Sequence, residues 1–81
     1  MATYDEILRE LPQIINKVAG TPIGEITPDK ALVNDLQIDS LSMVEIVLVA
    51  EDTFNVKIPD EDLKDLVTIS EVAGYIEREQ A

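Results

Sequence analysis

The sequence predicts an all-α protein, a single four-helix bundle with a short third helix and a long loop between helices one and two. Three observations support this. Apolar residues recur at helical spacing in the first and last parts of the chain. Helix-capping residues precede these stretches, and no segment alternates apolar and polar residues as a half-buried strand does. Since 81 residues supply one hydrophobic core only, we expect one domain spanning residues 1–81.

The first helix is expected over residues 4–19. Thr3 and Glu6 have the spacing of a capping box, in which each side chain satisfies a backbone amide of the other residue. Gly20 is suited to the left-handed conformation that commonly ends a helix. Pro12 lies inside the helix and removes one hydrogen bond, which predicts a kink or a division into two shorter helices. The apolar face comprises Ile7, Leu8, Leu11, Ile14, Ile15 and Val18.

A long loop is expected over residues 20–38, because Pro22, Gly24 and Pro28 punctuate this stretch. Loops of such length are uncommon in compact domains and are more often functional than accidental. The loop brings the chain to the second helix. Isolated apolar residues are expected to anchor it, namely Ile23, Ile26, Leu32, Val33 and Leu36.

The second helix is expected to begin after Asp39, a good N-cap residue, and to run to about residue 53. Its apolar residues are too many for one buried stripe, so some of them must face solvent or a partner. They are Leu41, Val44, Ile46, Val47, Leu48, Val49 and Ala50.

A short third helix is expected after Pro59, ending at about residue 65. Thr68 and Glu71 repeat the capping-box spacing and predict the start of the last helix. The apolar face of that helix comprises Ile69, Val72, Ala73, Tyr75 and Ile76. The expected core is Ile7, Leu11, Ile46, Ala50, Phe54, Ile58, Leu66, Ile69, Val72 and Ile76.

The charge balance restricts the partners of this protein. There are 17 acidic and 6 basic residues, which give a formal net charge of -11 and predict basic partners rather than nucleic acid or anionic lipid. The sequence has neither a signal peptide nor an apolar run long enough to cross a bilayer. We therefore expect a cytoplasmic protein with no stable membrane insertion.

Ser40 is the hydroxyl best placed for chemistry, at the point where the long loop gives way to the second helix. The chain contains no His and no Cys, so Ser40 has no imidazole base that would make it a conventional nucleophile. A small hydrolase is therefore disfavoured. The acids near Ser40 lack the glycine and the final glutamate of a calcium loop, and no metal site is expected. We interpret Ser40 as a modified residue of a protein that is not an enzyme.

One stretch resembles the attachment motif of acyl carrier proteins: Asp35-Leu36-x-x-Asp39-Ser40-Leu41, followed by Val44-Glu45. The segment Lys57-Ile58-Pro59-Asp60 also lies where that family has a counterpart. The resemblance implies that a phosphopantetheinyl transferase attaches 4'-phosphopantetheine from coenzyme A to Ser40, flanked by Asp39 and Leu41. It further implies that acyl chains are carried as thioesters on the thiol of this arm.

In the family, acids of the second helix dock to Arg and Lys patches on partner enzymes. The resemblance carries this role over to Asp39, Glu45, Glu51, Asp52 and Asp60. Leu41, Val44 and Leu48 share one side of the helix, and we expect Leu41 to be partly exposed. For Val44 and Leu48, partner contact and core burial are equally supported. Ile46, Ala50 and Phe54 are expected to belong to the core and to line a cavity for the acyl chain.

The pattern around Ser40 is most similar to fatty acid synthesis carriers of actinobacteria, although Gln37-Ile38 replaces the small or glycine-containing pair of many carriers. We therefore expect a free-standing, monomeric carrier of a type II system. Its partners would be ketosynthases, reductases, dehydratases and a malonyl transferase. Two alternatives remain: a type II polyketide carrier, and an acidic helical adaptor that never carries a covalent group.

Overall fold

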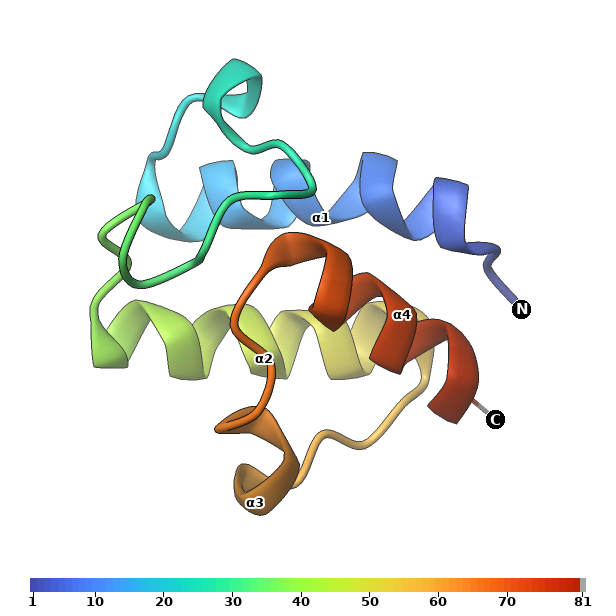
Figure 1. The fold of residues 1–81 in the computed structure, drawn as a ribbon. Helices are drawn as coiled ribbons and strands as arrows, with labels where there is room; N and C mark the ends of the chain where they lie inside the picture. The colour runs from blue at the N-terminus through green and yellow to red at the C-terminus, as the bar shows by residue number, and fades with distance from the viewer. Residues whose placement is uncertain (81) are drawn as a thin grey trace.

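The computed structural model describes residues 1–80. Its elements, in chain order, are α1 (Tyr4–Ala19), the 3-10 helix η1 (Ile23–Glu25), α2 (Ser40–Phe54), α3 (Asp60–Leu63) and α4 (Ile69–Glu79). Figure 1 shows that α1 and α2 run alongside each other, with α4 packed across them and α3 at the edge. The all-α fold with a short third helix and a long first loop is confirmed.

The helix α1 forms as its sequence pattern predicts. Both hydrogen bonds of the capping box between Thr3 and Glu6 are present, and Gly20 ends the helix with a φ of 78°. Figure 1 shows α1 as one continuous helix, so the expected division at Pro12 is wrong. Pro12 is buried together with Leu11 and its neighbours, and their packing stabilises the helix despite the lost hydrogen bond.

The long loop is tied to the chain just before α4. The Leu32 amide donates to the Val67 carbonyl at 3.0 Å, and the Ile69 amide donates to the Lys30 carbonyl at 3.0 Å. Four of its apolar side chains are buried, namely Ile26, Ala31, Leu32 and Ile38. Ile23 and Val33 were expected to be anchors, but they are largely exposed, because η1 and the following turns leave them at the surface.

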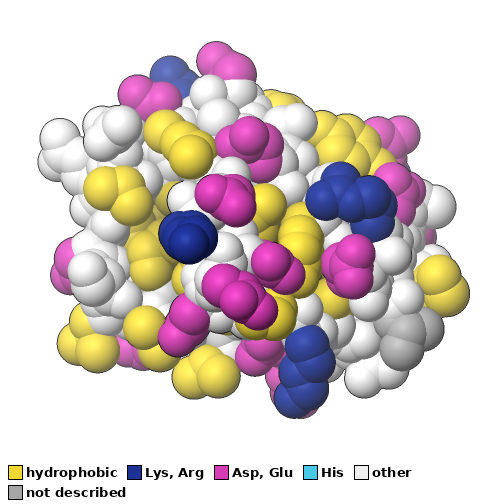
Figure 2. Space-filling view, turned by 60° about the horizontal axis from the view of Figure 1, so that its bottom comes forward, with side chains coloured by type: hydrophobic (Ala, Val, Ile, Leu, Met, Phe, Trp, Pro, Cys, Tyr) yellow, Lys and Arg dark blue, Asp and Glu magenta, His cyan; other side chains and the backbone are white. Residues whose placement is uncertain are grey.

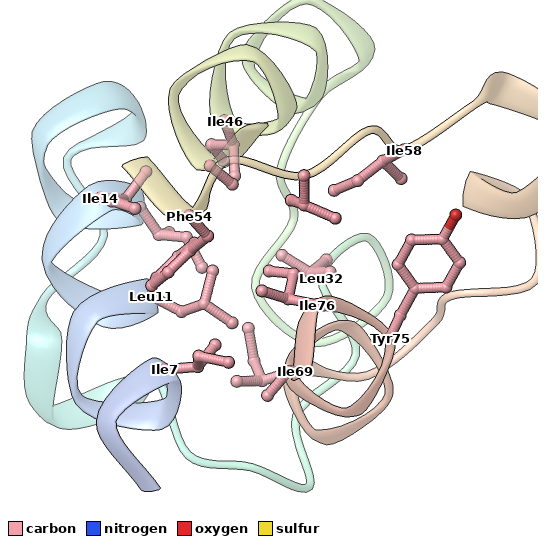
Figure 3. Close-up of a cluster of buried hydrophobic side chains, with 14 of the residues drawn as sticks. Ile7, Leu11, Ile14, Leu32, Ile46, Phe54, Ile58, Ile69, Tyr75 and Ile76 are labelled. Atoms are coloured by element: carbon pink, nitrogen blue, oxygen red, sulfur yellow. The ribbon is translucent and has the colours of Figure 1, made fainter. Parts of the chain in front are cut away.

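The core lies where α1, α2 and α4 meet, and Figure 3 shows side chains from all three helices converging there. Leu66 and Val72 were expected in this core, yet they are only half-buried and pack against its edge. The chain after α3 runs at the periphery, which explains this difference for Leu66. The expected core residues that are confirmed as buried are Ile7, Leu11, Ile46, Ala50, Phe54, Ile58, Ile69 and Ile76.

The helix α3 has four residues, none of them buried. It ends at Leu63, before the expected residue 65, because the chain tightens into turns there. The Asp65 amide donates to the Asp62 carbonyl and the Leu66 amide to the Leu63 carbonyl, both over three residues. None of the helices within residues 1–80 combines the length and the apolar character that crossing a bilayer requires.

Residues from the two ends of the chain are joined by polar contacts. The Gln80 side-chain amide donates to the Ala2 carbonyl at 2.6 Å and accepts from the Ala2 amide at 3.1 Å. Nearby, the Tyr4 hydroxyl lies 2.7 Å from the Ser70 hydroxyl. These contacts hold the start of α1 against α4.

Candidate functional site

Ser40 is the first residue of α2, and its side chain is exposed. Asp39 precedes it in an extended conformation and caps the helix, since its carboxylate accepts from the Ser42 amide at 2.7 Å. The Ser40 and Leu41 amides lie in the first turn, where a helix offers no backbone acceptor to its own N–H groups. An anion attached to Ser40 would therefore meet free N–H groups and the positive end of the helix dipole.

Asp39 remains charged in this setting. The hydrogen bond from the Ser42 backbone amide holds the pKa of the Asp39 carboxyl below its ordinary value. The carboxylate is thereby engaged with the third residue of the helix. The amides of the first two residues remain available for a phosphate.

The chain before Ser40 is held by the long loop. Ile38 is buried, and its amide donates to the Leu32 carbonyl at 3.1 Å. The Asp35 carboxylate accepts from the Ala31 amide at 2.7 Å and stabilises the preceding turn. These contacts fix the backbone two residues before Ser40, while Ser40 itself stays accessible.

Gln37 has a φ of 55°, in the left-handed region that favours glycine. Many carriers have a small or glycine-containing pair where this chain has Gln37-Ile38. The first residue of this pair is therefore the one with the unusual backbone conformation. We did not predict this conformation for Gln37. The glycine that is frequent in related motifs could have indicated a positive φ here, because glycine adopts a positive φ at little cost.

The exposed fractions of the apolar residues on α2 decide between partner contact and core burial. Leu41 is 72% exposed, Val44 54% and Leu48 58%. All three therefore lie on the surface, and the core interpretation of Val44 and Leu48 is wrong. Ile46, Ala50 and Phe54, on the other side of the helix, fill the core.

The acidic residues near α2 fall into two groups. Asp39, Glu45, Asp52 and Asp60 are exposed. Glu51 is half-buried, and its carboxylate accepts from the Ile58 amide at 2.7 Å. Glu51 thus connects α2 to the segment before α3, a contact for which the sequence has no local signal. Figure 2 views the α3 side of the molecule, where acidic side chains and exposed hydrophobic atoms lie interspersed.

A small apolar cavity lies inside the bundle. Its volume is about 20 Å³, room for about one water molecule, and only apolar side chains line it. Ile46 and Ala50 belong to its lining, as expected for a chain-binding cavity. Phe54 does not, although it is buried, because it packs elsewhere in the core.

The sequence model of the family described as "Phosphopantetheine attachment site" matches residues 9–76. The chain belongs to this family, that of the acyl carrier proteins. These proteins are carriers and not enzymes, and their cofactor is 4'-phosphopantetheine. The site described above fits this group, because an exposed serine hydroxyl lies at a helix N-terminus with amides that favour a phosphate.

Several characterised proteins are similar over most of the chain. An acyl carrier protein of Thermobifida fusca is 55% identical over 73 residues, which cover 90% of this chain and 92% of the relative. A meromycolate extension acyl carrier protein of Mycolicibacterium smegmatis is 52% identical, covering 95% of this chain and 78% of the relative. The solved acyl carrier protein of Enterococcus faecalis has a TM-score of 0.80 and 30% identity, covering 98% of this chain and all of the other.

Proposed function

We propose that Ser40 carries 4'-phosphopantetheine and that the protein transports growing acyl chains in type II fatty acid synthesis. The observation that carries this proposal is the position of Ser40, an exposed hydroxyl at the first residue of α2 within the matched family region. A phosphopantetheinyl transferase would transfer the phosphopantetheine phosphate from coenzyme A to the Ser40 oxygen. The pyrophosphate bond of coenzyme A breaks, adenosine 3',5'-bisphosphate leaves, and the Ser40 hydroxyl gives up its proton. Ser40 is then a substrate of that enzyme.

The chain itself supplies attachment and recognition. It contains no Cys, so the thiol that holds the acyl chain as a thioester comes from the arm. A flexible tether raises the concentration of the acyl group near the active site of a docked enzyme. Ser40 therefore requires exposure and a fixed backbone, both of which the loop and the Asp39 cap support.

The exposed face of α2 is the proposed docking surface. Its acids are Asp39, Glu45 and Asp52, with Asp60 of α3 beside them across the groove, and its apolar contacts are Leu41, Val44 and Leu48. Basic patches on the transferase, ketosynthases, reductases, dehydratases and malonyl transferase would pair with these acids. Charge pairs at the rim of an interface chiefly accelerate encounter, which suits a carrier that docks and leaves quickly.

Glu51 takes a different part in this proposal. Its carboxylate already accepts from the Ile58 amide, so its first effect is on the position of the segment before α3. We keep Glu51 at the edge of the docking surface, where its remaining charge adds to the negative field of α2. The carrier is proposed to act as a monomer in the cytoplasm.

The interior cavity is the proposed site for the distal part of an acyl chain. Its lining is entirely apolar, and burying each methylene of a bound chain is favourable by about 0.8 kcal/mol. At about 20 Å³ the cavity is smaller than such a chain, so the bundle would have to expand on loading. Ile46 and Ala50 of α2 would contact the chain.

The decisive experiment is intact-mass measurement after incubation with a phosphopantetheinyl transferase and coenzyme A. We expect the wild-type protein to gain one phosphopantetheine and Ser40→Ala to gain none. Ser42→Ala is the matched control, because it removes another hydroxyl from the same helical turn and should still be modified. An unmodified wild type, or modification that persists in Ser40→Ala, would contradict the proposal.

The pathway has a second candidate. The name of the Mycolicibacterium smegmatis relative, "Meromycolate extension acyl carrier protein", suggests elongation of meromycolate chains as an alternative duty. Loading and elongation assays with the two sets of enzymes separate these pathways by turnover, and a polyketide carrier would turn over poorly in both. The non-carrier adaptor is set aside, because the match to the attachment family covers residues 9–76.

A further inference from the structure

Gln37 has a backbone conformation that its own side chain does not favour. Its φ of 55° lies in the left-handed region, where the Cβ of an L-residue comes close to the following carbonyl oxygen. The other residues with positive φ are Gly20, which has no Cβ, and Asn55, whose short polar side chain tolerates the region. Gln37 is thus the one residue within the described chain that adopts this conformation without either advantage.

Contacts on both sides of Gln37 hold it in this conformation. The Gln37 amide donates to the Val33 carbonyl at 3.0 Å, and the next amide, that of Ile38, donates to the Leu32 carbonyl at 3.1 Å. The Ile38 side chain is buried in the core. The surrounding structure therefore imposes the positive φ, and a glycine at this position would satisfy the same contacts with less strain.

The side chain of Gln37 takes no part in the fold. It is exposed, and it makes no hydrogen bond within the part of the chain that the structure describes. The neighbouring polar side chains are used differently, since Asp35 accepts from the Ala31 amide and Asp39 accepts from the Ser42 amide. Folding alone therefore gives no reason for a glutamine at this position rather than a glycine.

Gln37 lies close to the oxygen that is modified in the proposed function. It is three residues before Ser40, at the point where the long loop meets α2 (Figure 1), and three residues of chain span at most about 11 Å. A standard protein interface buries about 800 Å² of each partner, which corresponds to a patch with a radius of about 16 Å. An enzyme that binds with Ser40 at the centre of such a patch therefore covers Gln37 as well.

The transferase is the partner that has to approach this part of the surface. It must bring the phosphate of coenzyme A to the Ser40 oxygen, whereas enzymes that act on a loaded chain work at the far end of the arm. Two exposed acids, Asp35 and Asp39, flank Gln37 in the sequence. The Gln37 amide is therefore a neutral hydrogen-bonding group in acidic surroundings, and a partner recognises it by geometry and not by charge.

We propose that the Gln37 side chain is a recognition element for the phosphopantetheinyl transferase, that it forms a neutral hydrogen bond with that enzyme, and that it is retained for this contact at a cost in folding stability. The proposal rests on the proposed function, because the partner concerned is the enzyme that modifies Ser40. Gln37 determines specificity and is not catalytic, since its contact is with the enzyme surface. Docking through the acids of α2 is screened by salt, whereas a neutral hydrogen bond is not.

The contact is tested by the kcat/KM of modification, measured with the transferase and coenzyme A. We expect Gln37→Ala and Gln37→Gly to lower kcat/KM by about three- to tenfold, the effect of losing one hydrogen bond. The loss should be the same at about 0.01 M and about 1 M salt, in contrast to the effect of charge reversal at Glu45. Gln13→Ala removes an exposed amide from α1 and should leave kcat/KM unchanged.

The cost in stability is tested by thermal unfolding of the same variants before modification. Gln37→Gly removes the Cβ and should raise the melting temperature by about 3–6 °C. Gln37→Ala keeps the Cβ, and with it the strain, so its melting temperature should stay within about 2 °C of wild type. A loss of kcat/KM in both variants, with stabilisation in only one, would assign recognition to the side chain and strain to the backbone.

The contrary outcomes are distinct. Equal kcat/KM in Gln37→Ala and wild type would overturn the recognition role, and so would a loss that disappears at about 1 M salt or that is confined to Gln37→Gly. An unchanged or lower melting temperature in Gln37→Gly would contradict the cost in stability. If the wild type is not modified, as seen by intact mass, the proposed function fails and this inference with it. Normal modification of the wild type combined with any of the other outcomes overturns this inference alone.

Discussion

The helices α1 and α2 have almost the same length, 16 and 15 residues, and pack into the same core, yet they arrange their apolar residues differently. In α1 the large apolar residues lie on one buried face, and the opposite face is polar. In α2 they lie on both sides, so Leu41, Val44 and Leu48 face solvent while Ile46 fills the core. The difference supports the proposal that α2, unlike α1, presents a docking surface in addition to its part in the core.

The starts of the two helices differ as well. At α1, Thr3 and Glu6 satisfy each other's backbone amides reciprocally. At α2, Asp39 accepts from the Ser42 amide alone. At the first residue of α1 the Tyr4 amide donates to the Glu77 carboxylate of α4, whereas the cap of α2 leaves the Ser40 amide accessible to a group on Ser40.

The largest expected effect is the difference in the free energy of unfolding between two leucine truncations. Leu11→Ala in α1 removes a side chain that is 1% exposed and should lower the free energy of unfolding by about 2–5 kcal/mol. Leu48→Ala in α2 removes one that is 58% exposed and should change it by less than about 0.5 kcal/mol. Urea unfolding followed by circular dichroism measures both. Equal losses would mean that α2 does not keep its apolar residues for partners.

The next effect concerns rates with partner enzymes. Glu45→Lys reverses an exposed charge on α2 and should slow modification by the transferase several-fold at about 0.01 M salt, with little effect near 1 M. Glu10→Lys makes the same reversal on the exposed face of α1 and is the control. Equal slowing by both variants would assign the effect to net charge rather than to a docking surface on α2.

A smaller effect distinguishes two glutamates within α2. Glu51→Ala should lower the free energy of unfolding by about 1 kcal/mol, because the Ile58 amide loses its acceptor. Glu45→Ala has the same change in helix propensity and should leave stability nearly unchanged. Chemical denaturation of the two variants side by side makes the comparison. Indistinguishable stabilities would mean that the Glu51 contact contributes nothing.

The smallest effect is a pH dependence at the start of α2. The pKa of Asp39 is lowered in the folded protein, so its ionised form favours folding above its ordinary value of 3.8, and this contribution is lost as pH falls below it. Asn also caps helices but carries no charge. The melting temperatures of wild type and Asp39→Asn should therefore differ most at neutral pH and converge in acid.

Thermal unfolding at a series of pH values measures this difference. Asp52→Asn removes one negative charge from the same helix and controls for the general effect of net charge. A gap between wild type and Asp39→Asn that stays constant with pH would contradict the assignment of charge-dependent capping to Asp39.

Local patterns in the sequence were sufficient for the elements that local interactions determine. The capping boxes at Thr3 and Thr68 involve residues three apart, and both are found where the spacing predicted them. The cap at Asp39 also depends on neighbouring residues only. Where apolar residues surround a helix, however, their periodicity does not determine which face is buried. The sequence pattern therefore supports both burial and exposure of Val44 and Leu48.

Contacts between separate segments were beyond the reach of these patterns. The bond from the Ile58 amide to Glu51 forms only when the chain after α2 turns back onto that helix, and the bond from the Tyr75 hydroxyl to Asp62 forms only when α4 packs beside α3. No spacing rule marks either pair. The half-burial of Leu66 has the same origin, because it depends on how the chain passes the edge of the core.

The paired hydrogen bonds between Ala2 and the Gln80 side chain have a practical consequence for engineering. They place residues near both ends of the chain side by side, an arrangement in which circular permutation is well tolerated. A short peptide could join these ends, and new ends could be opened in the exposed 3-10 helix η1 around Gly24. Such a permuted chain would keep the α2 surface but connect the helices in a different order. Its recognition by partner enzymes would show whether they depend on the shape of that surface alone.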